Sequence, residues 1–168
     1  MSPSSGTRRA TLADLPAITE IYNQGIEDGV ATLEYPTKSE AEMRDWFAAH
    51  DDRYAVLVAS ENDSTIGWAS LNRYSHRCAY DGVADLSVYV RRDRRGQGVG
   101  MALLQSLERA ARSAGFHKLV LFALTDNAAG KRLYERCGFR EVGVFCEQGK
   151  LRGQFVDVLI MEKVLKTG

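Results

Sequence analysis

A glycine-rich turn between a β-branched strand and an apolar helix constrains the fold of this chain more than any other feature. Residues 85–105 read DLSVYVRRDRRGQGVGMALLQ, in which a strand over Leu86–Val90 is followed by a basic loop, three alternate glycines and a helix. Glycine permits sharp turns and close approach of a ligand to the backbone. Unpaired N–H groups and the positive end of the helix dipole favour phosphate oxygens at such a helix start. The segment therefore predicts a phosphate-binding turn formed by Arg95, Gly96, Gln97, Gly98, Val99, Gly100 and Met101.

The spacing of the glycines leaves two interpretations of the phosphate compound. A dinucleotide fingerprint requires G-x-G-x-x-G, and Gly96, Gly98 and Gly100 do not put the third glycine in that place. Asp126, after the next apolar strand, would suit the acidic residue of that fingerprint. However, the loop before the turn is rich in arginine, and too little chain follows for a doubly wound sheet. The frame R-x-x-G-x-G, from Arg95 to Gly100, is therefore favoured.

Length and charge limit the classes of partner. The 168 residues predict a single domain, 1–168, with an ordered core over about 7–165. Lys and Arg number 22, as do Asp and Glu, so the net charge is zero, which removes any global attraction to nucleic acid or to an anionic membrane. The basic run Arg91–Arg95 is therefore a local feature. Beside the turn we interpret it as part of the phosphate site, and a solvated loop is the alternative.

Cysteines and histidines indicate neither a disulfide framework nor a metal site. Cys78, Cys137 and Cys146 are widely spaced and form no C-x-x-C pair, and the three histidines stand in unlike contexts. Residues 1–9 lack the apolar core of a signal peptide, and no apolar run approaches the roughly 20 residues of a membrane span. We expect a cytoplasmic protein without a metal and without nucleic-acid or membrane partners.

Apolar periodicity and turn signals predict a mixed α/β sheet with helices on both faces. Two capping-box patterns, Thr11-x-x-Asp14 and Ser39-x-x-Glu42, indicate helix starts. Gly67 indicates a bulge or a close backbone approach. The first helix should bury one stripe of apolar residues, formed by Leu12, Leu15, Ile18, Ile21 and Tyr22. Strands are expected over 7–10, 54–60, 65–71, 83–90, 118–124, 140–147 and 154–164, and helices over 10–29, from 39, over 98–114 and over 127–137.

Two motifs at a suitable separation carry a family resemblance over nearly the whole chain. The frame from Arg95 to Gly100 resembles the acetyl-CoA pyrophosphate signature [RQ]-x-x-G-x-[GA] of the GNAT acyltransferases. Asn127 followed by RLYERCGF at residues 132–139 resembles the second motif of that superfamily. The resemblance implies the GNAT fold, which has a mostly antiparallel central sheet with a splayed central strand pair. It also implies acetyl-CoA as cofactor and direct attack of an amine in a ternary complex.

The resemblance implies roles for residues around the turn. The backbone of Val88, Tyr89 and Val90 would hydrogen-bond the pantetheine arm, and Asn127 would contact coenzyme A or act only as a helix N-cap. Tyr134 matches the general acid that protonates the departing thiolate, with a core aromatic as the alternative. We predict Asp85 as the general base, directly or through water, because a neutral amine is needed for attack. A solvent-exposed aspartate at the strand end is the alternative.

Further segments resemble the phosphinothricin, methionine sulfoximine and arsinothricin N-acetyltransferases, which act on the α-amine of small glutamate-like compounds. They include Ile21–Asn23, Thr32–Glu34 with Pro36, Trp46-Phe47, Ala79-Tyr80 and Ser87–Val90. Phosphinothricin acetyltransferases often carry Glu at the place of Asp85, and some carry His at the place of Tyr134. Guanidinium binds carboxylate or phosphinate in a bidentate manner, which suits Arg73 and Arg77 to an acidic acceptor. The acceptor contacts implied by the resemblance are Glu34, Arg73, Ser75, His76, Arg77, Leu86 and Ser87.

Other hypotheses stay open at this point. The acceptor is alternatively a protein N-terminus or a polyamine, although Arg73 and Arg77 disfavour a polyamine. A coenzyme-binding regulatory module without turnover is a third hypothesis, which the presence of both Asp85 and Tyr134 disfavours. The resemblance also implies a homodimer, in which the apolar C-terminal strands pair across the interface.

Overall fold

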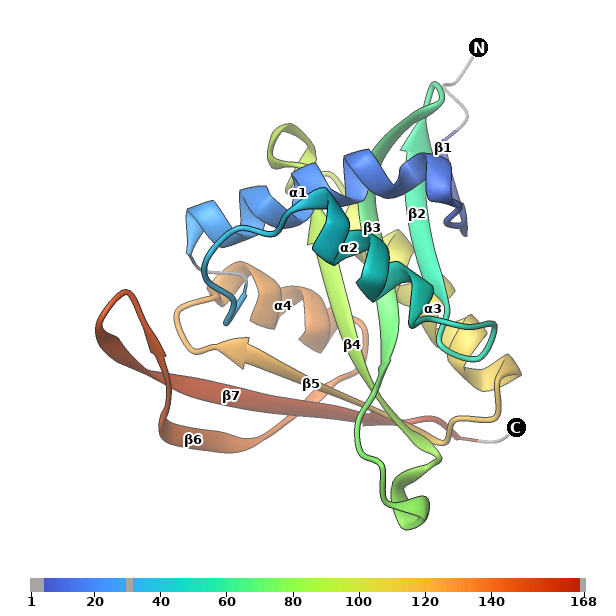
Figure 1. Cartoon of the computed structure of the whole chain (residues 1–168). Coiled ribbons are helices and arrows are strands. Elements are labelled where there is room, and N and C mark those ends of the chain that lie inside the picture. Colours follow the sequence, from blue (N-terminus) through green and yellow to red (C-terminus); the bar gives the residue numbers. More distant parts are fainter. Residues whose placement is uncertain (1–4, 30–31, 167–168) are drawn as a thin grey trace.

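The computed structural model describes residues 5–29 and 32–166. Seven strands form one sheet in the order β1-β2-β3-β4-β5-β7-β6, which confirms the predicted mixed sheet (Figure 1). All neighbouring strands are antiparallel except β4 and β5, which are parallel. The strands are β1 (Ser5–Arg9), β2 (Val56–Glu61), β3 (Ser64–Arg73), β4 (Val83–Val90), β5 (Lys118–Leu124), β6 (Arg140–Leu151) and β7 (Gln154–Val164).

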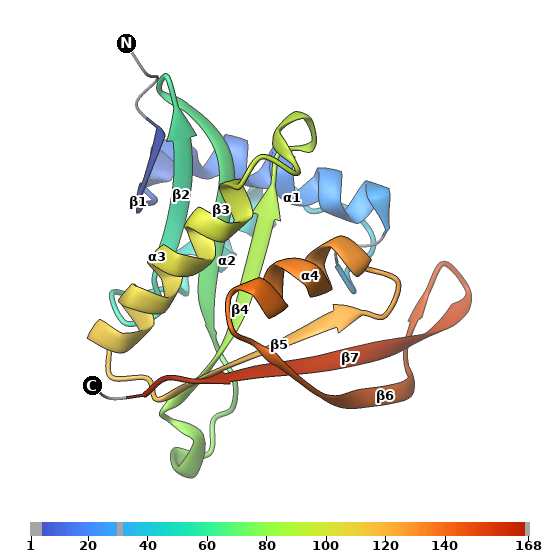
Figure 2. The ribbon, with the colours of Figure 1, turned by 180° about the vertical axis from the view of Figure 1, so that it is seen from behind.

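Two helices cover each face of the sheet, as Figures 1 and 2 show from opposite sides. Helices α1 and α2 lie on one face, where they bury a cluster centred on Ile18, Met43 and Trp68. Helices α3 and α4 lie on the other face, over a larger core that includes Leu86 and Leu103. The helices are α1 (Leu15–Asp28), α2 (Glu40–Ala48), α3 (Val99–Ser113) and α4 (Ala128–Arg136), with short 3-10 turns η1 (Leu12–Asp14), η2 (Cys78–Tyr80) and η3 (Arg92–Arg94).

Strands β4 and β5 separate after a short paired stretch, as the GNAT resemblance predicts. Their parallel register extends only from Val83↔Lys118 to Asp85↔Val120. On its other side β4 stays paired with β3 as far as Val90. Among the described residues, the edge of β4 from Leu86 to Val90 that faces β5 therefore has no strand partner. Figure 1 shows the two strands diverging from this point.

Local signals set most of the element boundaries. The Ser39 hydroxyl accepts a hydrogen bond from Glu42 N–H at 3.2 Å, and the Glu42 carboxylate accepts one from Ser39 N–H at 2.7 Å, so the predicted capping box is present. The bulge predicted at Gly67 is confirmed, because the β2–β3 register shifts beside it. A Cβ on Gly67 would lie 3.0 Å from Leu103, which also confirms the close approach.

Three expectations about burial and strand extent are wrong in detail. Leu12 is 63% exposed because η1 is a 3-10 turn, whose different period takes Leu12 off the stripe of α1. The continuous apolar run over 118–124 predicts a fully buried strand, whereas Phe122 on β5 is partly exposed. Strand β6 continues through Gly149, and the last connection is a tight turn at Arg152 and Gly153, both with positive φ. Val30, in the predicted segment after α1, lies outside the described residues.

Candidate active site

The glycine turn has the geometry of an anion cradle. Gly96 and Gly98 have φ of +75° and +85°, and a Cβ on either would meet no atom within 4 Å, so the space beside them is open. Gly98 is the N-cap of α3, whose first N–H groups have no partner within the helix. A Cβ on Gly100 would lie 2.9 Å from a Leu133 methyl, so this glycine allows α3 to pack on α4. The turn therefore offers backbone donors to a phosphate group, as predicted from its sequence.

The arginines before the turn are paired with acids of the same chain. Arg92 and Arg95 both bind Asp28, at the end of α1, at 2.8 and 2.6 Å. The Arg95 Nε also donates to the Val90 carbonyl at 3.2 Å, which ties the end of β4 to α1. The other ion pairs of this run are Arg91–Asp93, Arg92–Glu27 and Arg94–Glu61. The charge of the predicted basic run is thus largely balanced within the fold.

Asp85 lies at the last paired residue before β4 and β5 separate. Its Oδ1 accepts a hydrogen bond from Leu86 N–H at 2.8 Å. Burial raises the pKa of Asp85 from 3.8 to about 7, and this backbone hydrogen bond opposes the shift only in part. Near neutral pH the carboxyl group therefore exists in both protonation states, which suits a group that takes up and releases a proton.

Tyr134, on α4, shares this environment. Burial, and to a smaller extent the negative charge of Asp85, together raise the pKa of Tyr134 to about 12. The phenol is therefore protonated at neutral pH and is available as a hydrogen-bond donor. Asn127 is the N-cap of α4, where its side chain accepts from Gly130 N–H at 3.0 Å.

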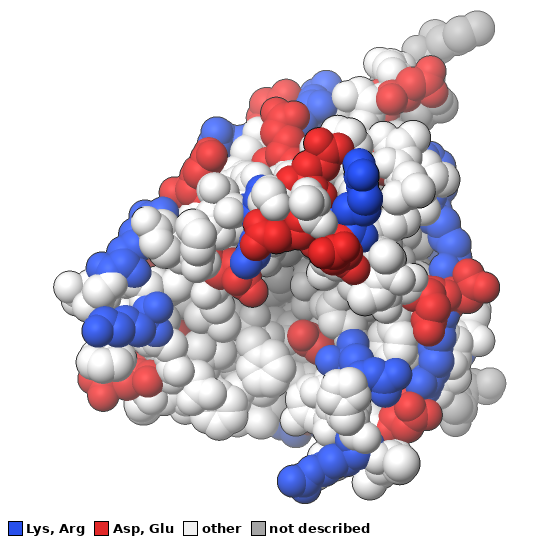
Figure 3. Space-filling model, viewed as in Figure 1, with Lys and Arg blue, Asp and Glu red and all other residues white. Residues whose placement is uncertain are grey.

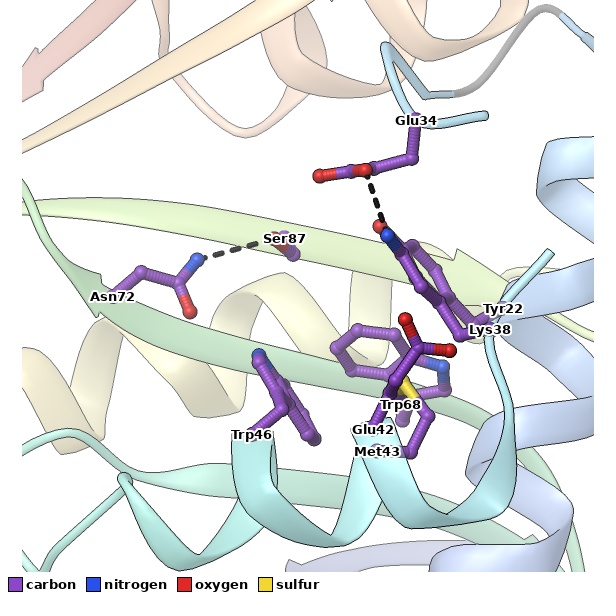
Figure 4. Close-up of a pocket in the computed structure, with 9 residues that line it drawn as sticks. All are labelled: Tyr22, Glu34, Lys38, Glu42, Met43, Trp46, Trp68, Asn72 and Ser87. Atoms are coloured by element: carbon purple, nitrogen blue, oxygen red, sulfur yellow. Dashed lines mark hydrogen bonds and ion pairs between the residues drawn. The ribbon is translucent and has the colours of Figure 1, made fainter. Parts of the chain in front are cut away.

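A cavity of about 370 Å³ opens on the α1/α2 side of the sheet, and the hollow in this face is visible in Figure 3. Figure 4 shows its lining, in which the rings of Trp46 and Trp68 form one wall below two separate polar pairs. The Nε1 of Trp68 is buried and has no hydrogen-bond partner among the described residues. The lining residues are Tyr22, Glu34, Lys38, Glu42, Met43, Trp46, Trp68, Asn72 and Ser87.

One polar end of the cavity leads to Asp85. Asn72 donates to the Ser87 hydroxyl at 3.1 Å (Figure 4). The His50 Nε2 lies 3.1 Å from the Asn72 Oδ1. Asn72 is also the cross-strand neighbour of Asp85 in the β3–β4 register. Ser87 lies two residues after Asp85, and alternate residues of a strand point to the same face. The Asn72–Ser87 end is therefore adjacent to the predicted base.

The opposite end of the cavity carries charge. The Lys38 ammonium lies 3.1 Å from the Glu34 carboxylate, on the other side of the cavity from Asn72 and Ser87 in Figure 4. Glu34 also raises the pKa of Tyr22, which burial shifts to about 12. The Glu34 N–H donates to the Thr32 hydroxyl at 3.1 Å, which holds the turn that carries this carboxylate.

The structure brings together only part of the predicted acceptor site. Glu34 and Ser87 line the cavity, whereas Arg73, Ser75, His76 and Arg77 are not among its lining residues. The Arg73 guanidinium lies 5.2 Å from the centre of the Tyr54 ring, and the Arg77 N–H donates to Ser75 within the loop. The Leu86 side chain is buried in the core on the α3 side.

Seven lining residues were not predicted from the sequence, namely Tyr22, Lys38, Glu42, Met43, Trp46, Trp68 and Asn72. Tyr22, Met43 and Trp46 have the spacing of ordinary core residues on amphipathic helices, Trp68 lies in an apolar strand, and no local pattern separates core from cavity residues. Glu42 belongs to the capping box and Lys38 directly precedes it, which accounts for polar residues there without any ligand.

Comparison with known proteins identifies the family of the chain. Residues 15–139 match the acetyltransferase (GNAT) family. The chain is 35% identical to an L-methionine sulfoximine/L-methionine sulfone acetyltransferase of Pseudomonas paraeruginosa, over 95% of this chain and 94% of the relative. It is 33% identical to a phosphinothricin N-acetyltransferase of Alcaligenes faecalis, over 92% of this chain and 80% of the relative.

A solved structure of a phosphinothricin acetyltransferase from Sinorhizobium meliloti in complex with AcCoA superposes with a TM-score of 0.91. Its sequence is 32% identical, and the match covers 100% of this chain and 91% of that one. The cofactor is acetyl-CoA, which fits the open glycine turn and the free edge of β4. The chain is an acyltransferase and belongs to the GNAT acetyltransferase family.

Proposed function

We propose that this enzyme transfers the acetyl group of acetyl-CoA to the α-amine of a small glutamate-like amino acid or a toxic analogue of one. Acceptors of the phosphinothricin, methionine sulfoximine and arsinothricin types fit this proposal. The observation that carries it is the position of Asp85, where β4 and β5 separate beside one end of the cavity. This position connects a cavity of amino-acid size with the free edge of β4. The acetyltransferase relatives support the same acceptor class.

Acetyl-CoA would lie along the free edge of β4 with its pyrophosphate on the glycine turn. The backbone N–H groups from Gly96 to Met101 would bind the phosphate oxygens, with Arg95 and Asn127 beside them. The backbone of Val88, Tyr89 and Val90 would hydrogen-bond the pantetheine arm. When bound, the cofactor supplies a thioester carbonyl as the electrophile.

Asp85 and Tyr134 would move the protons of the reaction. Asp85, in its carboxylate form, accepts a proton from the acceptor ammonium, which leaves a neutral amine for direct attack in a ternary complex. As the amide forms, the attacking nitrogen would lose its second proton, and Tyr134 would relay a proton to the departing sulfur so that coenzyme A leaves as the thiol. Because the pKa of Tyr134 is raised to about 12, the phenol would be protonated before and after this step, and its hydrogen bond to the sulfur would stabilise the developing thiolate.

Ser87 is a proposed acceptor contact from within the cavity, and Glu34 is proposed to lie beside the far end of the acceptor. Roles for Arg73, Ser75, His76, Arg77 and the backbone of Leu86 stay predictions from the resemblance. The Arg73–Arg77 loop leads from β3 into β4, and so ends close to Asp85 in the chain.

A polyamine is a second candidate acceptor, because two carboxylates, Glu34 and Glu42, line the cavity. Acidic side chains favour a cationic acceptor. However, the Glu34 carboxylate is paired with Lys38, and the Glu42 carboxylate accepts a hydrogen bond from Ser39 N–H, so both carboxylates already have partners. The amino-acid acceptor is therefore preferred.

Release of free coenzyme A from acetyl-CoA tests the proposal. The amine panel contains L-phosphinothricin, L-methionine sulfoximine, spermidine and a peptide with a free N-terminus. Release with the two amino-acid analogues alone is the expected result. Release with spermidine alone would establish the polyamine acceptor instead. Binding of acetyl-CoA without release for any amine would favour a binding module over an amino-acid acetyltransferase.

We also propose that the protein acts as a cytoplasmic homodimer. Strand β6 is the last strand of the sheet, and β6 and β7 expose several large apolar side chains, namely Val142, Val144, Phe145 and Phe155. An exposed edge strand with apolar side chains favours pairing with a second chain. None of the helices in residues 5–29 and 32–166 is both long and apolar enough to cross a membrane.

A further inference from the structure

We propose that Lys38 is the anchor for an acidic distal group of the acceptor and that Glu34 occupies this anchor while the cavity is empty. The inference rests on the proposed amino-acid acetyltransferase function. It assigns specificity to a residue that no sequence motif indicates, and it makes Glu34 a competitor of the acceptor.

Lys38 is the one cationic side chain among the described residues that line the cavity. Its backbone is fixed to α1, because Lys38 N–H donates to the Asn23 side chain at 2.8 Å and Asn23 donates back to the Lys38 carbonyl at 2.9 Å. Its side chain is 25% exposed. The backbone of Lys38 is therefore anchored to α1, and its side chain extends from this fixed point to the cavity.

The partner of Lys38 is more easily displaced. The Glu34 side chain is 50% exposed, and its carboxylate lies 3.1 Å from the Lys38 ammonium. Exposed ion pairs of this kind contribute little to stability, so replacing the Glu34 carboxylate by an acidic group of the acceptor costs little free energy. Glu42, the other lining carboxylate, accepts from Ser39 N–H at 2.7 Å and remains in place as part of the capping box.

The position of Lys38 determines which acidic group it meets. The Asn72–Ser87 pair lies at the left and the Lys38–Glu34 pair at the upper right of the cavity in Figure 4, and the rings of Trp46 and Trp68 lie below the open space that separates the two pairs. An acceptor whose amine is directed to Asp85 would thus extend its far end toward Lys38. An anionic far end, such as a phosphinate or carboxylate, would replace Glu34, whereas a neutral sulfone would not.

The test compares two acceptors that differ in distal charge, L-phosphinothricin (anionic) and L-methionine sulfone (neutral), at saturating acetyl-CoA. Lys38→Met should raise KM for phosphinothricin about tenfold or more, because a hydrogen bond to a charged group is lost, and should affect KM for methionine sulfone far less. Glu34→Gln should lower KM for phosphinothricin, by about two- to fivefold, because the competing carboxylate is removed. The two variants should therefore act in opposite directions on one acceptor.

Arg44→Met is the matched control, because Arg44 forms a similar ion pair with Glu40 but does not line the cavity. Arg77→Ala, measured in parallel, tests the anchor predicted from sequence. Equal effects of Lys38→Met on both acceptors, or a higher KM for phosphinothricin in Glu34→Gln, would overturn the inference alone. Failure of the wild-type enzyme to acetylate either compound would instead refute the proposed function.

Discussion

Asp85 has the same chemical group as the exposed aspartates of this chain, and its surroundings alone make it a candidate base. Burial at the point where β4 and β5 separate raises its pKa to about 7. A base with a pKa near the working pH combines a useful ionised fraction with useful basicity. The sequence identified the residue through its place before the glycine turn, but the shift follows from the fold.

The pH dependence of the rate tests this role. Below pH 7 Asp85 holds its proton, so kcat/KM should rise with pH and bend near pH 7 in the wild-type enzyme. Asp85→Asn should lower kcat by about 100-fold and remove that bend, because general base catalysis contributes about 10²- to 10⁴-fold. The control is Asp52→Asn, a fully exposed carboxylate, which should keep the bend. An unchanged profile in Asp85→Asn would exclude Asp85 as the base.

The buried carboxyl group should also make stability depend on pH. The pKa of Asp85 is about 7 in the folded protein and has its ordinary value of 3.8 in the unfolded chain, so the unfolded chain loses the proton first as pH rises. Asp85 therefore has no effect below about pH 4, destabilises the fold increasingly from pH 4 to 7, and costs at most about 4 kcal/mol above pH 7. The Tm advantage of Asp85→Asn over wild type should grow between pH 4 and pH 8. A constant Tm difference over that range would contradict the raised pKa.

Tyr134→Phe separates donation to sulfur from simple packing. The phenyl ring keeps the packing near Phe139, whose ring centre lies 6.0 Å away, so Tm should change little. Loss of the hydroxyl should lower kcat by about 10- to 100-fold, near the lower range for acid–base groups, because the proton relay and the hydrogen bond that stabilises the developing thiolate are both lost. KM for acetyl-CoA should stay nearly constant. A Tyr134→Phe variant with the kcat of the wild-type enzyme would show that the Tyr134 hydroxyl is not needed for catalysis and that Tyr134 is only a core aromatic.

The strand–turn–helix element combines two functions in three glycines. Gly96 and Gly98 adopt positive φ beside open space, whereas Gly100 has no room for a Cβ because of Leu133. The first two glycines shape the turn that offers N–H donors, and the third keeps α4, which carries Tyr134, against the start of α3. The element therefore links the phosphate cradle to the proposed acid through packing.

Gly100→Ala should disturb this link. Its methyl group would lie 2.9 Å from Leu133, and overpacking of this kind costs about 1–3 kcal/mol. We expect a lower Tm and a KM for acetyl-CoA raised about fivefold or more, because the first turn of α3 must shift. Gly143→Ala is the control, since a Cβ there meets no atom within 4 Å. Equal Tm and equal KM for acetyl-CoA in the two variants would show that α3 and α4 accommodate the added methyl group and that the glycine turn is not disturbed.

At the scale of the whole molecule, the sheet ends in an exposed strand. Sedimentation or light scattering should give a mass of about twice 18.6 kDa if β6 and β7 form the proposed dimer interface. Val144→Lys, on β6, should shift the protein toward monomer with little change in Tm. Leu12→Lys, an exposed apolar position on η1, should leave the mass unchanged. A monomeric wild-type protein would refute the dimer.

The sequence alone determined the features that depend on neighbouring residues. The glycine turn, the capping box at Ser39, the extent of β4 and the N-cap at Asn127 all follow from local backbone preferences and short-range hydrogen bonds. These signals lie within a few residues of the structure that they specify. For that reason the family motifs and the fold were predictable from them.

Only the tertiary structure decided what surrounds the reacting groups. The cavity combines residues of α1, the segment before α2, α2 itself, β3 and β4, which lie up to 65 positions apart, from Tyr22 to Ser87. The arginines beside the turn form ion pairs with acids on α1 and β2. The predicted acceptor loop does not line the cavity, whereas Lys38 does. Burial and pairing depend on groups that are distant in the chain. No local pattern could therefore give the pKa of Asp85 or the charge that faces the acceptor.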